Sequence, residues 1–401
     1  MYKFTFIVVI LISIYQCKKP DTGATAGLPI ISEPYKTLQE MFIDAKPGDT
    51  LLLARGIYEL DRALSLDGVP GVTIRGAGMQ ETILSFKHQI SGAEGLRITA
   101  DSVTLEDFTV IDAKGDGIKV QGATQVYMRR VQATWSDGAK TTNGGYGFYP
   151  VQCNGVLIEH CEARYASDAG IYVGQSRNVI VRNCLAYGNV AGIEIENCIH
   201  AEVYDNRAEN NTGGILVFDL PDLQLVNGYD CKVYRNTIVE NNHDNFAPPG
   251  NIVGTVPPGT GIILMAAKQV EVFDNTIVGH KTMGTAIASY QLAQLPWKDR
   301  NYDPYTREIT IRNNRYERKS ALPDLTKDFG KMVNLLFPGK PQDILYDGIL
   351  PDDAQGVNPQ RICLHENLSA DEVLRFANVD AAHDFKNVNK NISDYQCASV
   401  Q

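Results

Sequence analysis

Two glutamates separated by a single residue, Glu194 and Glu196, are the side chains whose type and spacing most directly suggest chemistry. In an extended strand, residues two apart point to the same face, and their Cα atoms lie about 6.6 Å apart. That separation is near the lower limit for the two carboxyl groups of an inverting glycoside hydrolase, of which one is an acid and the other a base. Glu194 and Glu196 are therefore candidate catalytic residues, and Asp168 and Asp219 are expected near the same patch.

Carboxylates gathered in one place repel one another, so one of them keeps its proton to a higher pKa or a cation occupies the site. Because Ca²⁺ prefers oxygen ligands, Asp168, Glu196 and Asp219 are candidate calcium ligands. Asp219 is also a catalytic candidate, and Lys119, Lys140 or a tyrosine is the candidate base of a lyase or an epimerase. The alternative is that the two glutamates only make a strand face soluble.

A repeated strand pattern predicts how these side chains are positioned. Ile171, Ile193 and Ile215 each follow a glycine and are spaced by 22 residues. The pattern lacks the Leu-x-x-Leu-x-Leu frame and the helical segment of a leucine-rich repeat. It therefore predicts an all-β fold, a single-stranded right-handed parallel β-helix of the pectin lyase type. Eight segments alternate apolar and polar residues as half-buried strands do, namely 103–108, 126–131, 156–161, 179–184, 201–206, 231–236, 270–275 and 309–314.

Stacked coils place equivalent residues in columns. If Ile171, Ile193 and Ile215 point inward, the residues after them point outward. The outward column then contains Lys119, Tyr149, Tyr172 and Glu194, and a second column contains Glu196 and Phe218. Four polar residues follow at the next bend: Gln152, Gln175, Asn197 and Asp219.

Four segments are longer than the usual turn of this repeat. Residues 133–147 and 239–261 leave the solenoid at one corner, and residues 219–230 and 291–308 leave it after the other end of the same strand. They are expected to enclose a trough about four coils long, roughly 20 Å, which suits several units of a polysaccharide or glycan.

The predicted substrate-binding set combines flat aromatic faces for sugar rings with polar donors. Its members are Trp135, Lys140, Tyr149, Gln152, Tyr172, Gln175, Asn197 and Phe218.

Asparagine and cysteine share one inward column of the repeat. Asn206, Asn236, Asn275 and Asn314 are expected to form hydrogen bonds from coil to coil. Cys161 and Cys184 are neighbours in the same column and are expected to be a reduced, packed pair.

The N-terminus has the features of an export signal. Lys3 and an apolar stretch precede Cys17, which resembles a bacterial lipoprotein signal. This interpretation predicts a signal peptide over 1–16, lipidation of Cys17 and a tether over 17–34. The chain is then a periplasmic or outer-membrane lipoprotein of the cell envelope, whose lipid anchor is its only contact with the membrane. The alternative is an ordinary cleaved signal peptide and a secreted protein.

The remaining chain divides into the solenoid and a tail. The β-helix is predicted over 35–320, with a capping helix near 35–45 that covers the first coil. The tail over 321–401 is predicted to contain a short helix from about residue 369 to 377. Cys363 and Cys397 bracket this helix and are the candidate disulfide partners in an exported protein.

Composition excludes some partners and leaves others open. The 401 residues are 44% hydrophobic and 21% charged, with a net charge of −10 and no basic block. A nucleic-acid partner is therefore not expected. The sequence also lacks the phosphate-loop, Cys-x-x-Cys, His-Glu-x-x-His and Gly-x-Ser-x-Gly motifs.

The run from residue 145 to 221 resembles the bacterial parallel β-helix repeat lipoproteins, a family of unassigned function. The resemblance implies the fold, export and a co-exported protein partner. More remotely, the architecture is similar to pectate lyases, polygalacturonases and alginate epimerases, although the Asp-Pro-His-Asp string of the epimerases is absent. Two functions follow as hypotheses. The first is a glycan-binding protein that acts as a lyase, epimerase or hydrolase, and the second is a non-catalytic scaffold that docks a co-exported protein.

Overall fold

The computed structural model of the chain describes residues 27–32, 34–319, 321–370 and 373–397. The predicted signal peptide over 1–16, Cys17 and most of the predicted tether lie outside the described residues. Within the described ranges, no helix is long and apolar enough to cross a membrane.

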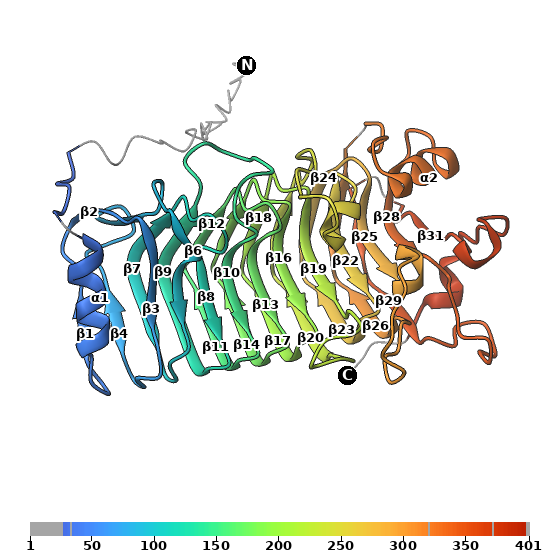
Figure 1. Ribbon diagram of the computed structural model, residues 1–401. Coiled ribbons are helices and arrows are strands. Elements are labelled where there is room, and N and C mark those ends of the chain that lie inside the picture. The colour runs from blue at the N-terminus through green and yellow to red at the C-terminus, as the bar shows by residue number, and fades with distance from the viewer. Residues whose placement is uncertain (1–26, 33, 320, 371–372, 398–401) are drawn as a thin grey trace, which may run out of the picture.

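The described chain winds into a solenoid whose strands stack in two long parallel sheets (Figure 1). Sheet B has 11 strands, usually one from each coil. They are β3 (Arg62–Leu66), β6 (Ser91–Ile98), β8 (Ile118–Gln121), β10 (Tyr146–Val151), β13 (Ala169–Gly174), β16 (Ala191–Glu196), β19 (Gly213–Phe218), β22 (Thr260–Met265), β25 (Met283–Ala288), β28 (Gln342–Tyr346) and β31 (Phe376–Asn378).

Sheet A has 20 strands and forms the remaining sides of the coils, in most coils as two strands separated by a bend. Its first ten strands are β1 (Thr50–Leu52), β2 (Gly56–Glu59), β4 (Thr73–Arg75), β5 (Thr82–Ser85), β7 (Thr104–Ile111), β9 (Thr124–Thr134), β11 (Asn154–Glu159), β12 (Glu162–Arg164), β14 (Arg177–Arg182) and β15 (Leu185–Tyr187). The other ten are β17 (Ile199–Tyr204), β18 (Arg207–Glu209), β20 (Tyr229–Tyr234), β21 (Thr237–Val239), β23 (Lys268–Phe273), β24 (Thr276–His280), β26 (Arg307–Arg312), β27 (Arg315–Arg318), β29 (Ile362–His365) and β30 (Leu368–Ser369).

The register of sheet B has the phase that the sequence repeat predicts. Ile171 pairs with Ile193, and Ile193 pairs with Ile215, in parallel register. All three side chains are fully buried in the apolar core between the sheets. The predicted parallel β-helix is therefore confirmed.

A ladder of buried asparagines joins the coils at one bend of sheet A. The Oδ1 atom of Asn236 accepts hydrogen bonds from the backbone N–H of Asn206 at 3.0 Å and from its Nδ2 at 3.1 Å. Asn275 and Asn314 repeat the arrangement in the following coils. Each amide thus satisfies polar groups that would otherwise be stranded inside the core.

A second ladder, which the sequence analysis did not identify, lies at the bend before sheet B. Asn189, Asn211 and Asn241 stack in the same way, with a distance of 2.8 Å between Asn211 Nδ2 and Asn241 Oδ1. The column ends at His280, whose Nε2 lies 3.1 Å from Asn241 Nδ2. Complete burial lowers the pKa of His280 to about 3, so the ring is neutral and can accept this hydrogen bond.

The buried cysteines of the coils are free thiols. Cys161 and Cys184, the predicted reduced pair, are both buried without a disulfide. Burial raises the pKa of the Cys161 thiol well above its ordinary value, which keeps the thiol protonated and unreactive.

The first coil is covered by helix α1 (Pro34–Asp44), as predicted (Figure 1). Leu38 and Phe42 on this helix are buried in the core at the open end of the sheets. The helix therefore prevents the first strands from pairing with another chain.

The solenoid continues beyond residue 320, so the predicted boundary there is wrong. Strands β28 and β31 extend sheet B, and β29 and β30 extend sheet A. The helix of this region is α2 (Asp328–Leu336). The prediction of a helix over 369–377 is also wrong, because the described residues of that range belong in part to β30 and β31. Long insertions between these strands hide the repeat in the sequence.

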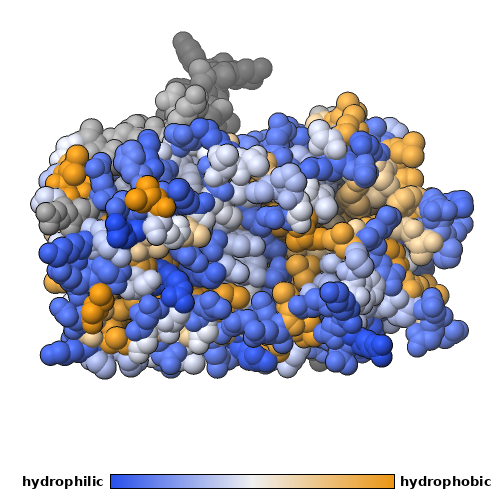
Figure 2. Space-filling view, in the orientation of Figure 1, coloured by the Kyte–Doolittle hydropathy of each residue, from blue (hydrophilic) through white to orange (hydrophobic). Residues whose placement is uncertain are grey.

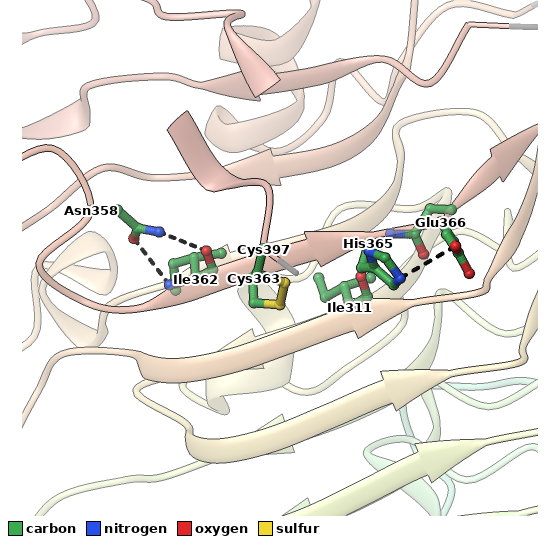
Figure 3. The surroundings of a disulfide bond; sticks show 8 residues. Ile311, Asn358, Ile362, Cys363, His365, Glu366 and Cys397 are labelled. Carbon is green, nitrogen blue, oxygen red and sulfur yellow. Dashed lines mark hydrogen bonds and ion pairs between the residues drawn. A yellow bond between two sulfur atoms is a disulfide. The ribbon is translucent and has the colours of Figure 1, made fainter. Parts of the chain in front are cut away.

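A disulfide between Cys363 and Cys397 joins β29 to the end of the described chain (Figure 3). Next to it, Gln396 pairs with Leu364 in a parallel bridge. The Asn358 side chain exchanges two hydrogen bonds with the backbone of Ile362 at the start of β29. The tail is thus fastened across the edge of the last coil.

The asparagine ladder predicts a large loss of stability on substitution. Asn236→Ala removes the acceptor for Asn206 and the donor to the Val203 carbonyl, and leaves buried polar groups unpaired. We expect the free energy of unfolding to fall by about 2–4 kcal/mol, measured by urea denaturation. Asn154→Ala, at an exposed position, is the control and should change it by less than about 1 kcal/mol. Equal losses in the two variants would contradict the role assigned to the ladder.

Candidate functional site

The outward residues of sheet B change from polar to apolar along the solenoid. Lys119 pairs with Tyr149, and Tyr172 pairs with Glu194 in the next coils, so the predicted polar column exists. From Glu194 onward the column becomes apolar, as Leu216, Ile263, Ala286 and Leu345 follow in register.

The long insertions leave the solenoid at the corners that the sequence predicts. Residues 135–145 connect β9 to β10, and residues 240–259 connect β21 to β22, so both lead from sheet A into sheet B. Residues 219–228 and 289–306 lead from sheet B back to sheet A. A further segment of the first kind, residues 319–341, carries α2.

Four of these segments, residues 219–228, 240–259, 289–306 and 319–341, place apolar residues against the outward face of sheet B. Val253, Val256, Tyr290, Tyr302 and Phe337 pack with the outward residues of the sheet in a second apolar cluster. The four-coil trough expected from the sequence is therefore largely filled, and only 3% of Tyr172 and 1% of Glu194 remain exposed. The expectation placed these insertions at the edges of an open trough, whereas their apolar residues are buried against the sheet.

A cluster of buried carboxyl groups lies beneath this cover. Glu196 Oε1 accepts a hydrogen bond of 2.7 Å from the Tyr172 hydroxyl. Asp168 Oδ2 accepts one of 2.7 Å from Asn251 Nδ2, which comes from the segment between β21 and β22. Glu194 Oε2 is buried and has no hydrogen-bond partner among the described residues.

Burial and mutual repulsion keep these carboxyls protonated to unusually high pH. Burial and the charge of Glu196 raise the pKa of Asp168 to about 7, against the opposing effect of its hydrogen bonds. Burial raises the pKa of Glu196 to about 7, with the Tyr172 hydrogen bond opposing it. Burial raises the pKa of Glu194 well above its ordinary value. The predicted raising of a carboxyl pKa in this patch therefore applies to three groups.

Three tyrosine rings pack beside the carboxyls. The centroid of Tyr146 lies 4.5 Å from that of Tyr149 and 4.6 Å from that of Tyr172. The Tyr172 hydroxyl reaches Glu196 across Gly174, where a Cβ atom would lie 2.0 Å from the hydroxyl oxygen. Gly174 is thus the residue that allows this hydrogen bond.

The cluster opens to solvent at its N-terminal end, around Lys119. The Lys119 ammonium lies 3.5 Å from Glu94 Oε1, 4.0 Å from Asp116 Oδ2 and 4.9 Å from the centroid of the Tyr149 ring. The side chain of Lys119 is 22% exposed, and that of Asp116 is 17% exposed. Burial and the nearby Glu94 raise the pKa of Asp116 to about 6, although Lys119 acts in the opposite direction.

Several predicted ligand contacts have structural roles. Trp135 is buried and donates a hydrogen bond of 2.8 Å from Nε1 to the Ala113 carbonyl, so it offers no free face to a sugar. Phe218 is also buried. Asn197 holds the segment after β19 through hydrogen bonds to Leu220 and Leu225, so its side chain is not available to a ligand.

The other predicted binding residues lie at the rim of this face. Lys140 is exposed and pairs with Asp137 at 2.9 Å. Gln175 Oε1 accepts a hydrogen bond from the backbone of Gln224. Gln152 lies half-buried at the bend after β10.

The calcium site expected at Asp168, Glu196 and Asp219 is not assembled. Asp219 is buried in an ion pair with Lys268, 2.9 Å from Oδ2 to Nζ. In the part of the chain that the structure describes, no group of three or more acidic, histidine or cysteine residues is placed to hold a metal ion.

The sequence analysis missed three members of the site: Asp116, Tyr146 and Asn251. Asp116 lies two residues before β8, and Tyr146 is the first residue of β10. The strand register could therefore have identified both. Asn251 lies in an insertion, and no periodic signal in the sequence indicates its position.

Comparisons with known proteins agree with the fold. The family model described as the right handed beta helix region matches residues 94–227. The described chain has the right-handed parallel β-helix fold.

One curated relative is the pre-neck appendage protein of Bacillus phage B103, which is 23% identical over 207 residues. The match covers 42% of this chain and 24% of that protein, so the chain spans about a quarter of the relative's length.

Three solved structures are similar to this chain over 70–86% of its length. The A-module of the mannuronan C-5 epimerase AlgE6 of Azotobacter vinelandii is 14% identical, with coverage of 84% of this chain and 90% of that chain and a TM-score of 0.44. Pectate lyase Pel9A is 12% identical, with 70% of each chain covered and a TM-score of 0.45. The DFA-IIIase of Arthrobacter chlorophenolicus A6 is 11% identical, with coverage of 86% and 96% and a TM-score of 0.49.

The raised carboxyl pKa values predict how stability depends on pH. The pKa of Glu196 is about 7 in the folded chain and about 4.3 in an unfolded one, so its stabilising contribution is complete below pH 4.3 and is lost as pH rises to 7. Glu196→Gln keeps the acceptor for Tyr172 and removes this loss. We expect the variant to unfold at a higher urea concentration than the wild type at pH 8, with the difference vanishing near pH 4.

A matched control separates this effect from the general acidity of the chain. Glu202→Gln, on sheet A, replaces a half-buried glutamate that also accepts a tyrosine hydrogen bond, from Tyr234. This variant should keep the pH profile of the wild type. Parallel profiles for Glu196→Gln and the wild type between pH 4 and pH 8 would show that the Glu196 carboxyl is not perturbed.

Proposed function

We propose that this chain binds a polysaccharide or glycan at the open end of the sheet B face and acts on it by proton transfer. The observation that supports this proposal is the grouping of Asp116, Lys119 and Tyr149 on two neighbouring coils. A carboxyl with a pKa of about 6, an ammonium group and a partly exposed ring meet there within reach of solvent.

Each of these three groups has a role that its chemistry supports. The Tyr149 ring offers an apolar face to a sugar ring and a hydroxyl to its edge. Asp116 exchanges its proton near neutral pH, as a general acid or base must. Lys119 places a positive charge where a sugar carboxylate or a developing negative charge would lie.

The buried carboxyls act indirectly in this proposal. Repulsion from Glu196, and to a smaller extent from Asp116, contributes to the raised pKa of Asp168. A change in the charge of Asp116 during a reaction therefore changes the pKa values of neighbouring carboxyls that are themselves protonated near neutral pH. Glu194 and Glu196, the original catalytic candidates, would reach substrate only if the segment between β21 and β22 moved away.

Binding and chemistry can be separated by substitution. Tyr149→Ala should weaken glycan binding at least about tenfold, because it removes the stacking face. Asp116→Asn should retain binding and lower turnover by about 100-fold or more, because a general acid or base is lost. Binding is measured on a glycan array and then by calorimetry, and turnover by new reducing ends, unsaturated sugars or changes in epimer ratio.

Control variants on sheet A test whether the effect is local. Tyr127→Ala and Lys232→Met replace a partly exposed tyrosine and a half-buried lysine outside the proposed site. Neither should alter binding or turnover. Loss of glycan binding in the control variants, or unchanged binding in Tyr149→Ala, would refute the proposed site.

The second candidate function is a non-catalytic scaffold that docks a co-exported protein. The burial of Glu194, Glu196 and Tyr172 favours it, because covered groups cannot contact a glycan in the described state. A scaffold would show no turnover on any glycan. Its partner should be lost from pull-downs when the segment between β21 and β22 is shortened.

We further propose export and anchoring through Cys17. The apolar stretch before Cys17 supports this, and a disulfide such as Cys363–Cys397 persists in oxidising compartments. Cys17→Ser should move the protein from the membrane fraction to the soluble fraction and abolish labelling by a clickable fatty acid. Full membrane association in Cys17→Ser would contradict the anchor, and Cys153→Ser, at a buried thiol, is the matched control.

A further inference from the structure

A hollow lies over the C-terminal half of the outward face of sheet B, away from Asp116 and Lys119. It is a cleft of about 540 Å³ between η1 (Ile252–Thr255), η2 (Tyr290–Ala293) and α2. Hydrophobic side chains gather around a hollow in this part of the surface (Figure 2). The volume is in the range of sites for small organic molecules.

The floor of the cleft consists of outward positions of sheet B that are apolar without exception. They are Phe218 on β19, Ile263 and Met265 on β22, and Met283, Ala286 and Ala288 on β25. On a solvent-facing sheet such positions are expected to be largely polar. None of these side chains is more than 8% exposed, so only a small part of each one faces the cleft.

The walls are largely apolar, with Thr255, Gln294 and Thr326 as their uncharged polar members. Val256, Leu292, Phe329 and Phe385 line them, and Met332 projects from α2. Methionine side chains are flexible and polarisable, so they fit irregular or mobile apolar ligands. A sugar is a poor occupant, because its hydroxyl groups would find no hydrogen-bond partners on the floor.

Charge is confined to the rim of the cleft. Lys327 lies at the N-terminus of α2, beside Asp328. Asp328 is engaged by Lys331 at 2.8 Å, whereas the Lys327 ammonium forms no ion pair with another described residue. The mouth therefore offers one unpaired positive charge above an apolar interior.

We propose that this cleft binds a free long-chain fatty acid, with the alkyl chain on the floor of sheet B and the carboxylate at Lys327. The apolar floor of the cleft matches the chemistry of an alkyl chain. The rim supplies the single cation that a carboxylate head group requires. This site is separate from the proposed glycan site, and either can exist without the other.

A fatty-acid series tests the alkyl-chain part of the proposal. Saturated fatty acids from eight to eighteen carbons are titrated below their critical micelle concentrations, in competition with a fluorescent fatty-acid analogue. Affinity should rise by up to roughly fourfold for each added methylene and then level off when the cleft is full. Affinity that does not depend on chain length would overturn the proposal.

Substitutions within the cleft test its location. Ala286→Leu fills the floor, and Met332→Gln makes the wall of α2 polar. Both should weaken binding of an eighteen-carbon fatty acid at least about tenfold, while circular dichroism and the unfolding midpoint confirm that each variant is folded. Leu335→Gln, at a position of α2 that is 79% exposed, is the control and should leave binding unchanged. Equal binding by all three variants would also overturn the proposal.

The head group is tested at Lys327. Lys327→Met should weaken binding of the fatty acid about tenfold and leave binding of the alcohol of the same chain length unchanged. Binding of vesicles of anionic phospholipid without binding of free fatty acid would assign the face to a membrane surface and reject the proposal. Glycan turnover by the cleft variants should equal that of the wild type, so failure here is distinguishable from failure of the proposed glycan site.

Discussion

The in-phase stacking of successive coils is the constraint on which the rest of the structure depends. Parallel backbone hydrogen bonds hold each strand on its neighbour, and a shift by one residue would exchange the inward and outward faces of every coil. The buried asparagine ladders oppose such a shift. Asn236, for example, binds the side chains of Asn206 and Asn275 together with the backbone of the previous coil, and only one register satisfies all of these bonds. The columns of outward residues, and with them any site on sheet B, follow from this register.

The sequence predicts the part of the structure that is periodic. The 22-residue spacing of Ile171, Ile193 and Ile215 was sufficient to identify the fold and to place Tyr172 next to Glu194, as the register shows. Asparagine at the bend was recognised because it recurs at the same position. The capping helix was recognised because its apolar spacing precedes the first strand. These features depend on contacts between neighbouring coils, and residues that contact each other in this way recur at a regular spacing in the sequence.

The non-periodic part could not be predicted in the same way. Trp135 was predicted to contact a ligand because it lies in an insertion. The insertion turns back, however, and buries the ring against the preceding coil. Asn251 reaches Asp168 over a separation of 83 residues, and Tyr302 donates a hydrogen bond to the Asp219 carbonyl over the same separation. Such contacts depend on the path of each insertion, and the composition of a loop does not specify its path. The closed face of sheet B is the result of several of these paths together.

Covering this face changes its chemistry as well as its shape. An open trough would leave Glu194 and Glu196 ionised in water, whereas the cover removes water and makes the charged forms costly. The Asn251–Asp168 hydrogen bond joins the cover to the carboxyl cluster, so the protonation of the cluster and the position of the segment between β21 and β22 are linked. Ionisation of Asp168 and Glu196 as pH rises through about 7 places repelling charges under that segment and weakens its closed position. The floor of the apolar half has no titratable group, and its cover is held by apolar packing together with hydrogen bonds such as that from the Tyr302 hydroxyl to the Asp219 carbonyl. Closure of the polar half therefore depends on a cluster of buried carboxyl groups that the floor of the apolar half lacks.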